Sequence, residues 1–388
     1  MSAVNDDITR ALDRAGDELE QLSRKIHDNP ELGYQEVKAC AWLAEFLAGK
    51  GFKVERSVAG VDTAFRATIE TGDGPTIAIM CEYDALPAIG HACGHNVIAA
   101  AGAGAGAGLA AVRDRLPKGR IHVIGTPAEE GGGGKIKLLR GGVFREVDVA
   151  MMVHGWDTWI PHQDLLGIVR VGFEFTGKAA HAAADPWEGV NALDAVIQTF
   201  NNVSMLRQQM RPDARIHGIV TNGGAAPNII PEVAACTFYV RAAKLDYMWE
   251  LYRRVVACAE GAAKATGCSM TVVDMEAPYE PLKRNNTLLG LFKANMTSVG
   301  AVESPAPDRL GSSDIGNVSQ VIPAIQPMVQ IAPNGTPIHS RAFEKAATTP
   351  LARQGMCQAA KTMAMTTYDL LADPGLVKRA RAEFEAMK

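Results

Sequence analysis

The spacing of apolar positions predicts alternating helices and strands in the first part of the chain. Residues 6–27 carry apolar side chains at mostly three- and four-residue steps, which indicates an amphipathic helix, and residues 37–47 form a second one. Residues 76–81 are almost wholly apolar, as expected for a strand buried on both faces. Further helices are predicted at 97–115 and 135–140, and further strands at 120–125 and 147–153. This order is typical of an α/β domain, with a mostly parallel sheet and helices on both of its faces.

The pattern changes near residue 166 and returns near residue 281. Between them the predicted order is βαββαβ, which is that of a ferredoxin-like α+β domain. Its strands are expected at 166–176, 216–221, 234–241 and 269–275, and its helices at 191–208 and 247–266. We therefore expect one domain made of residues 1–166 and 282–388, interrupted by a second domain at 167–281, since 388 residues are too many for one ordinary core.

The returning segment has less regular patterns. Residues 321–331 are apolar and strand-like, but Pro323 and Pro327 must interrupt the strand or place it at a sheet edge. Residues 348–371 have the periodicity of a helix.

Composition and charge exclude several classes of protein. The net charge of −4 supplies no basic face for nucleic acid. Residues 97–112 are uncharged but rich in Gly and Ala, which indicates a buried small-residue helix rather than a membrane span. Residues 1–36 lack the apolar segment of a signal peptide, and the seven scattered cysteines suit a reducing compartment without a disulfide framework. We expect a cytoplasmic protein that binds neither nucleic acid nor membranes; the lack of a C-x-x-C pair also disfavours a redox thiol protein.

Metal-ligating residue types gather where predicted strands end. Cys93 and His95 are separated by Gly94, so both side chains can converge on one point. Either residue alone would be read as a buried cysteine or a turn histidine, but together, between a strand and a helix, they indicate metal ligation. His154 ends another strand and is a further candidate ligand, whereas His91 fits a supporting or structural role equally well.

Glu129 and Glu130 follow a predicted strand and precede the glycine run 131–134. Side chains of adjacent residues diverge, so one carboxylate can bind a metal while the other reaches a water molecule. The glycines allow the backbone to approach a bound group closely. We assign Glu130 as a ligand and Glu129 as the general base and acid, against the alternative of an exposed acidic turn.

Other polar residues carry weaker signals, and each has a structural alternative. His339 lies in a turn, and His181 is flanked by alanines in the inserted domain. Asn228 lies between prolines and could present its amide to a ligand or hold a turn. Arg241 could bind a substrate carboxylate or a surface acid, and Asp84 could orient a ligand histidine.

Taken together, these residues resemble metallopeptidase family twenty, the aminoacylase- and carboxypeptidase-like metal-dependent amidohydrolases. The resemblance is strongest to the branch of aminobenzoyl-glutamate, indole-acetyl-amino-acid and β-alanyl-dipeptide hydrolases, and it runs nearly end to end. The segments that carry it are 24–27, 30–32, 84–87, 90–95, 127–131, 177–182 and 228–231, with Arg241 and His339.

The resemblance implies a catalytic domain interrupted by a lid through which two chains form a homodimer. It implies one or two divalent ions, Mn²⁺ or Zn²⁺, and Glu129 as the catalytic base. His181 would stabilise the oxyanion, while Asn228 and Arg241 would bind the substrate carboxylate. The implied metal ligands are Cys93, His95, Glu130, His154 and His339.

Two positions depart from the family pattern. Glu82 stands where much of the wider family has histidine, and it could bind metal, support a ligand, or do neither. Asn96 stands where many relatives carry aspartate. Both departures leave the number and identity of the ions open.

The expected function is that of a metal-dependent amidohydrolase acting on a small-molecule amide. It would cleave the C–N bond of an N-acyl amino acid or dipeptide with a metal-activated water. One alternative is a hydrolytic deaminase acting on a non-peptide C–N bond such as that of an aromatic amine, which would release ammonia instead of an amino acid. Another is a non-catalytic metal-binding protein, but a closed structural site would have no use for Glu129 beside Glu130.

Overall fold

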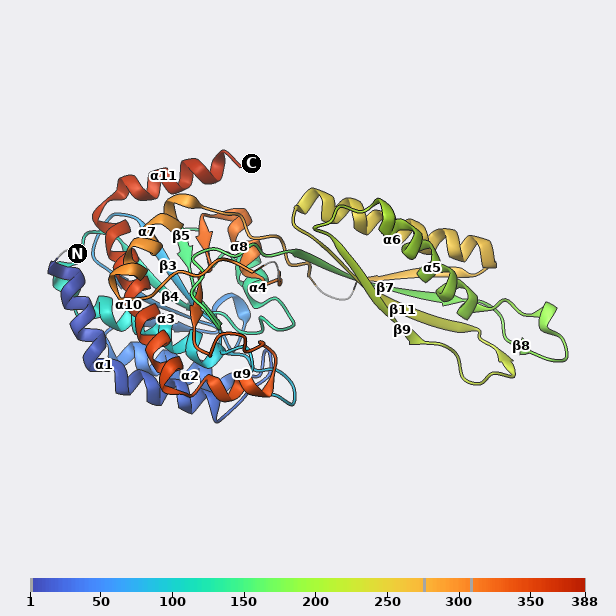
Figure 1. Cartoon of the computed structure of the whole chain (residues 1–388), viewed down its shortest axis with the longest axis horizontal. Helices are drawn as coiled ribbons and strands as arrows, with labels where there is room; N and C mark the ends of the chain where they lie inside the picture. Colours follow the sequence, from blue (N-terminus) through green and yellow to red (C-terminus); the bar gives the residue numbers. More distant parts are fainter. Residues whose placement is uncertain (1–2, 275–276, 308–309, 388) are drawn as a thin grey trace. The chain divides into compact units, whose positions relative to one another are not determined.

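The chain folds into two units, each with its own sheet and helices (Figure 1). The split unit comprises Met1–Asp164 and Leu282–Lys388, and the inserted unit comprises Leu165–Pro281. The computed structural model describes residues 3–274, 277–307 and 310–387. Met275, the last residue of the strand expected at 269–275, lies outside the described residues.

A six-stranded sheet forms the centre of the split unit, in the order β1-β2-β4-β3-β5-β13. Its strands are β1 (Lys53–Arg56), β2 (Phe65–Glu70), β3 (Thr76–Cys81), β4 (Arg120–Gly125), β5 (Val149–Met151) and β13 (Ala324–Ile325). The pairs β4–β3, β3–β5 and β5–β13 are parallel, whereas β2 runs antiparallel to both β1 and β4. The expectation of a mostly parallel sheet is therefore confirmed, with an antiparallel edge that sequence patterning did not predict.

The apolar segment at 321–331 is interrupted as its prolines required. β13 ends before Pro327, and a second short strand, β14 (Met328–Gln330), pairs with β6 (His154–Trp156) in a separate ladder. The β6–β14 pair is parallel, with Met328 opposite His154. This ladder places the start of β6 beside the end of the main sheet.

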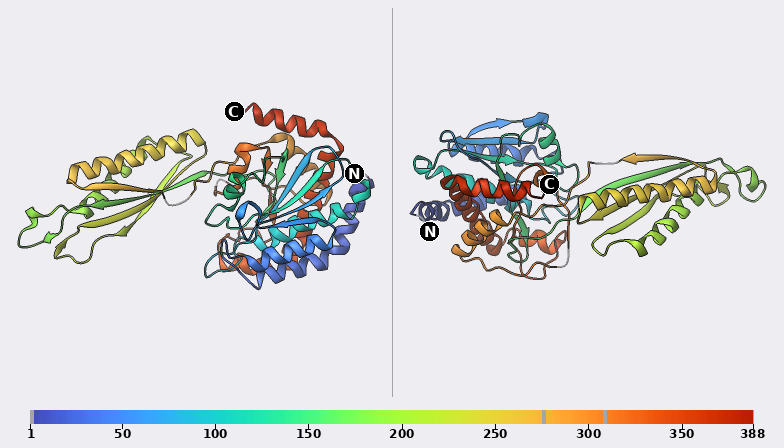
Figure 2. Two further views of the ribbon diagram at one scale, coloured as in Figure 1. Left: turned by 180° about the vertical axis from the view of Figure 1, so that it is seen from behind. Right: turned by 90° about the horizontal axis from the view of Figure 1, so that it is seen from above.

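Helices enclose the sheet of the split unit, and α1 and α2 lie side by side in Figure 2. They are α1 (Ala3–His27), α2 (Val37–Gly49), α3 (His95–Ala110), α4 (Gly134–Arg140), α7 (Asn286–Ser298), α8 (Ile315–Val321), α9 (Arg341–Ala346), α10 (Pro350–Ala372) and α11 (Pro374–Glu385). The Gly- and Ala-rich α3 is buried from His95 to Leu109 and packs against β3, α1 and α10. It is thus the buried small-residue helix that the sequence predicted. Within the described residues, no helix is both long and apolar enough to cross a membrane.

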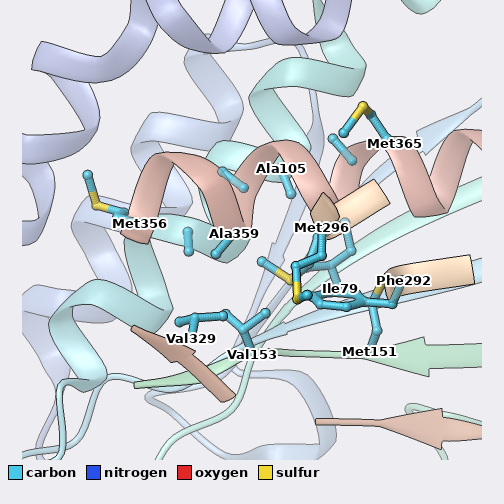
Figure 3. Close-up of a cluster of buried hydrophobic side chains, with 14 of the residues drawn as sticks. Ile79, Ala105, Met151, Val153, Phe292, Met296, Val329, Met356, Ala359 and Met365 are labelled. Carbon is cyan, nitrogen blue, oxygen red and sulfur yellow. The ribbon is translucent and has the colours of Figure 1, made fainter. Parts of the chain in front are cut away.

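The main apolar core lies between the sheet and helices α3, α7 and α10 (Figure 3). Ile79 of β3 and Met151 of β5 meet Phe292 and Met296 of α7 there. Side chains from both halves of the split unit fill this core, so the segment after the insertion is an integral part of the same fold.

The inserted unit is a four-stranded antiparallel sheet in the order β12-β7-β11-β9. Its elements are β7 (Gly167–Thr176), α5 (Ala192–Leu206), β9 (Arg215–Asn222), β11 (Val233–Ala242), α6 (Leu245–Thr266) and β12 (Ser269–Asp274). Both helices contact β7 and β11 (Figure 1). The order βαββαβ is as expected. A separate two-stranded ladder joins β8 (Ala180–His181) to β10 (Ile229–Ile230).

Candidate metal centre

Cys93 and His95 lie at the turn that leads into α3. Gly94 between them has φ of +79°, and a β-carbon at this position would clash with the side chain of Ile331. Only glycine adopts this conformation readily, and it lets the two flanking side chains turn towards the same point. The Sγ atom of Cys93 lies 3.4 Å from Nε2 of His154, the first residue of β6.

His95 is oriented by Asp84. The Nδ1 atom of His95 lies 2.8 Å from the backbone oxygen of Asp84 and 3.1 Å from its Oδ1 atom. The opposite nitrogen, Nε2, is buried and has no hydrogen-bond partner in the part of the chain that the structure describes. The contact expected between Asp84 and a ligand histidine is therefore present, and it leaves Nε2 available to a metal.

Glu129 and Glu130 lie near the Nε2 atom of His95, and His339 lies near Glu130. The Nε2 atom of His95 lies 4.0 Å from Oε2 of Glu129 and 3.9 Å from Oε1 of Glu130. The Nε2 atom of His339 lies 3.3 Å from Oε1 of Glu130. The backbone N–H of Glu130 donates to Oδ2 of Asp84 at 2.9 Å, so Asp84 holds both a histidine and a glutamate of this group.

The donor atoms of these residues form overlapping groups. Within each group, one nitrogen, oxygen or sulfur atom per residue lies within 4.8 Å of the others. Three of the groups are Cys93–His95–His154, Cys93–Glu130–His339 and His95–Glu129–Glu130, and a fourth is Glu82–Glu129–Asp314. The structure therefore brings together the five residues predicted as ligands and Glu129, whereas His91 belongs to none of the groups found among the described residues.

The charges of this group suit a divalent cation. Burial raises the pKa of the Cys93 thiol well above its ordinary value, and it also raises the pKa of Glu129, with Glu82 and Glu130 adding to the effect. Burial acts in the same direction on Glu130, but the His339 and His95 imidazoles outweigh it and lower the pKa of that carboxyl. A divalent ion would offset the cost of ionising buried thiol and carboxyl groups, and sulfur, imidazole and carboxylate are its ordinary ligands.

A buried ion-pair cluster adjoins this group and was not predicted. Lys135, in α4, pairs through Nζ with Oε1 of Glu82 and with Oδ1 of Asp314, the latter at 2.6 Å. All three side chains are fully buried. Although burial acts to lower it, the neighbouring carboxylates raise the pKa of Lys135. Lys135 lies in the helix predicted at 135–140, and the local sequence pattern does not distinguish a buried lysine from an exposed one.

Glu82 lies between the ion-pair cluster and the metal-ligating group. Its Oε1 atom faces Lys135, while Oε2 lies 3.6 Å from Nε2 of His95. Oε2 of Glu82 is buried and has no hydrogen-bond partner within the described ranges. Glu82 thus lies at the edge of the candidate metal centre, within reach of a ligand histidine.

His181, Asn228 and Arg241 belong to the inserted unit. His181 pairs with Ile229 in the β8–β10 ladder, and just beyond the ladder the backbone N–H of Ala182 donates to the backbone oxygen of Asn228 at 3.0 Å. The Nδ1 atom of His181 accepts from the N–H groups of Ala183 and Ala184, both at 3.2 Å, so its ring proton is on Nε2. Arg241 lies on β11, with its guanidinium carbon 5.8 Å from the ring centre of Tyr239.

The chain is similar to a known family and to curated proteins. The model of peptidase family M20/M25/M40 matches residues 78–356, a segment that contains the candidate metal centre and the whole inserted unit. The Xaa-Arg dipeptidase of Mus musculus is 39% identical to the chain over 391 residues, covering 96% of the chain and 90% of the relative. One of the subunits of the p-aminobenzoyl-glutamate hydrolase of Escherichia coli is 30% identical over 445 residues, covering 94% of the chain and 91% of the relative.

A solved structure has the same fold. The crystal structure of YXEP from Bacillus subtilis, a dinuclear metal-binding peptidase from the M20 family, superimposes with a TM-score of 0.71 at 22% identity. The match covers 92% of the chain and 99% of that protein. Its extent shows that both units, and not the metal-binding unit alone, have counterparts in a known structure.

Proposed function

The chain belongs to peptidase family M20/M25/M40, and from that premise we propose that it cleaves a dipeptide or an N-acyl amino acid at the Cys93–His95 centre. It is a metal-dependent hydrolase of amide C–N bonds, as the dipeptidase and hydrolase activities named for its relatives indicate. The observation that carries the choice of site is the convergence of the Cys93, His95, Glu130, His154 and His339 donor groups.

Glu129 acts as the general base in this proposal. When bound, a divalent ion would polarise the scissile carbonyl and lower the pKa of a water molecule. Glu129 takes the proton of the attacking water and returns it to the leaving amine nitrogen. Its carboxylate oxygen lies 4.0 Å from Nε2 of His95, next to the ligand group, which supports this role.

The inserted unit supplies the remaining contacts in this proposal. The Nε2–H of His181 donates to the developing oxyanion, and its tautomer, held by two backbone N–H groups, suits that role. Asn228 and Arg241 bind the carboxylate of the substrate. We further propose that this unit serves as a lid, residues 167–281, on a catalytic domain made of residues 1–166 and 282–388.

We also propose a homodimer formed through the inserted unit. β9 lies at one edge of that unit's sheet, where its backbone can pair with a second strand. Ile219 and Val220 on this strand, and Met205 on α5, are exposed apolar side chains. An edge strand with exposed apolar residues is a suitable surface for a second copy of the chain.

The metal is Mn²⁺ or Zn²⁺ in this proposal, and two ions fit the site. The dinuclear metal binding named for the Bacillus subtilis structure supports two, as does the overlap of donor groups that share Cys93. The cytoplasm is the proposed location, because a buried cysteine ligand and scattered free cysteines suit a reducing compartment.

Removal and return of metal tests this function. Exhaustive chelation should abolish hydrolysis of alanyl-arginine and p-aminobenzoyl-glutamate, and added Mn²⁺ or Zn²⁺ should restore it. The released product is identified by chromatography, because a free amino acid indicates amide hydrolysis whereas ammonia indicates deamination. Full activity in protein shown to be metal-free by elemental analysis would contradict the proposal.

A further inference from the structure

The turn between α1 and α2, residues 31–36, hydrogen-bonds to two of the loops that carry the candidate metal centre. The backbone oxygen of Glu31 accepts from the N–H of Ala85 at 2.8 Å, next to Asp84. The Oε1 atom of Glu36 accepts from the N–H of Ala128 at 2.8 Å, next to Glu129. The Tyr34 hydroxyl donates to the backbone oxygen of Gly132 at 2.6 Å. The 31–36 turn therefore holds the Glu129–Glu130 loop on both sides of its two carboxylates.

The backbone at Ala128 needs such support. Ala128 has φ of +57°, in the left-handed region that an alanine rarely adopts. Gly33 of the 31–36 turn lies against it, since a β-carbon at Gly33 would be 3.0 Å from Cβ of Ala128. Without a partner for its N–H, Ala128 would be free to relax into an ordinary conformation and carry the next residue with it.

Glu36 is unusual in how its carboxylate is used. It is fully buried and stands at the start of α2, yet its side chain does not cap that helix. Burying a carboxyl group is costly unless it makes specific contacts, and the contact of Glu36 that reaches the Glu129–Glu130 loop is the N–H of Ala128. Burial raises the pKa of Glu36 to about 7. The buried Glu36 carboxylate thus binds the backbone of a loop that is 92 residues away in sequence, and through this hydrogen bond it can control the geometry of that loop.

We propose that Glu36 and Tyr34 are positioning residues that set the orientation of the Glu129 carboxylate. The inference rests on the proposed function, in which Glu129 is the base. Rotation about the backbone of Ala128 moves Glu129 directly. Glu130 has two anchors outside the 31–36 turn, its N–H on Asp84 and its carboxylate beside His339, so it should keep its place when Ala128 is released.

The first test removes the hydrogen bond between the Glu36 carboxylate and the N–H of Ala128. Glu36→Leu removes the acceptor, and kcat should fall roughly 10- to 100-fold, the scale of a misplaced catalytic group. The Kd for Mn²⁺, measured by calorimetry, should stay within about threefold of wild type because Glu130 keeps its own anchors. Glu36→Gln keeps an acceptor oxygen and should retain at least about a third of wild-type kcat. Glu45→Leu, an exposed glutamate on the same helix, is the matched control and should leave kcat unchanged.

The second test asks whether Glu36 acts through Glu129. In the Glu129→Gln background, Glu36→Leu should lower the residual kcat by less than about threefold, because residues that act as a unit are not additive. A loss of the same size in both backgrounds would overturn the inference. A purely structural role predicts that same equal loss, so this comparison separates the two explanations.

Tyr34→Phe keeps the inference testable if Glu36→Leu does not fold. It removes one hydroxyl and should lower kcat about 3- to 10-fold, the scale of one hydrogen bond, with the same dependence on Glu129. Wild-type kcat in folded Glu36→Leu and in Tyr34→Phe would overturn the inference while leaving the proposed function intact. Wild-type kcat in Glu129→Gln would instead overturn the assignment of the base, and with it the proposed function of this site.

Discussion

At the residue scale, Glu129 and Glu130 show how neighbours in sequence acquire different surroundings. Glu130 makes close contacts with Asp84 and His339, which fix both its backbone and its carboxylate. Glu129 lies beside Glu82 and Asp314, and one carboxylate oxygen of each residue lies within 4.8 Å of the others. A carboxylate beside other carboxylates binds a proton more readily, which suits a group that must accept and return one.

Exchanging each glutamate for glutamine should separate these roles. Glu129→Gln should lower kcat by roughly two to four orders of magnitude, because a lost general base costs about that much, while the metal content stays at the wild-type level. Glu130→Gln should lose metal, since a ligand carboxylate is removed. Elemental analysis after gel filtration gives the metal content of both variants. Equal metal loss in the two variants would show that the roles are divided wrongly.

At the element scale, a helix can approach a strand closely where glycine stands at the contact. Gly355 lies inside α10, and a β-carbon there would clash with the backbone oxygen of Gln330 in β14. Gly290 lies in α7, and a β-carbon there would meet nothing within 4 Å. The two glycines share a helical conformation and differ only in what surrounds them.

Alanine at these two positions should therefore act in opposite directions. Gly290→Ala should raise the free energy of unfolding by roughly 0.5–1 kcal/mol, since alanine is the better helix former. Gly355→Ala should lower it by roughly 1–3 kcal/mol, because overpacking against the backbone of β14 outweighs helix propensity. Urea denaturation followed by circular dichroism measures both values. A stabilising Gly355→Ala substitution would show that α10 can move away from β14 at little cost.

At the scale of the whole molecule, the catalytic proposal needs residues from two units. The donor groups of the metal centre all lie in the split unit, whereas His181, Asn228 and Arg241 lie in the inserted unit. We propose that His181 serves the site of the neighbouring chain in a homodimer formed through the inserted unit. Light scattering at micromolar concentration should therefore give the mass of a dimer, and a monomer would count against this arrangement.

Mixing two inactive variants tests the exchange of His181 between the two chains of a dimer. His181→Ala should lose about 100- to 1000-fold in rate, the scale of one oxyanion donor, with its metal retained. An equal mixture of His181→Ala and Glu129→Gln should recover about a quarter of wild-type activity, because half of the dimers would be mixed and each would have one intact site. If the mixture stays inactive after mass spectrometry shows that the chains have exchanged, His181 does not act across a dimer.

Prediction of the fold from sequence succeeded where the signal was local. β3 and β4 have the predicted bounds, 76–81 and 120–125, and for β3 the signal was the continuous apolar run of a buried strand. β1 and β2 were not predicted. β1 is short, largely charged and partly exposed, so it has little apolar pattern of its own. Its place at the sheet edge depends on pairing with β2, which apolar periodicity within β1 does not reveal.

The sequence by itself determined the βαββαβ order of the inserted unit, the α/β class of the split unit and the residue types of the candidate metal centre. Apolar periodicity is local, and Cys93, His95, Glu130 and His154 all follow strands whose carboxyl ends meet at one edge. Only the tertiary structure decided which buried groups meet across long separations. Lys135 pairs with Asp314, 179 residues away, and Glu36 holds Ala128, 92 residues away. Such pairs depend on which loops the sheet brings together, and a lysine or glutamate has the same appearance in sequence whether it faces solvent or a buried partner.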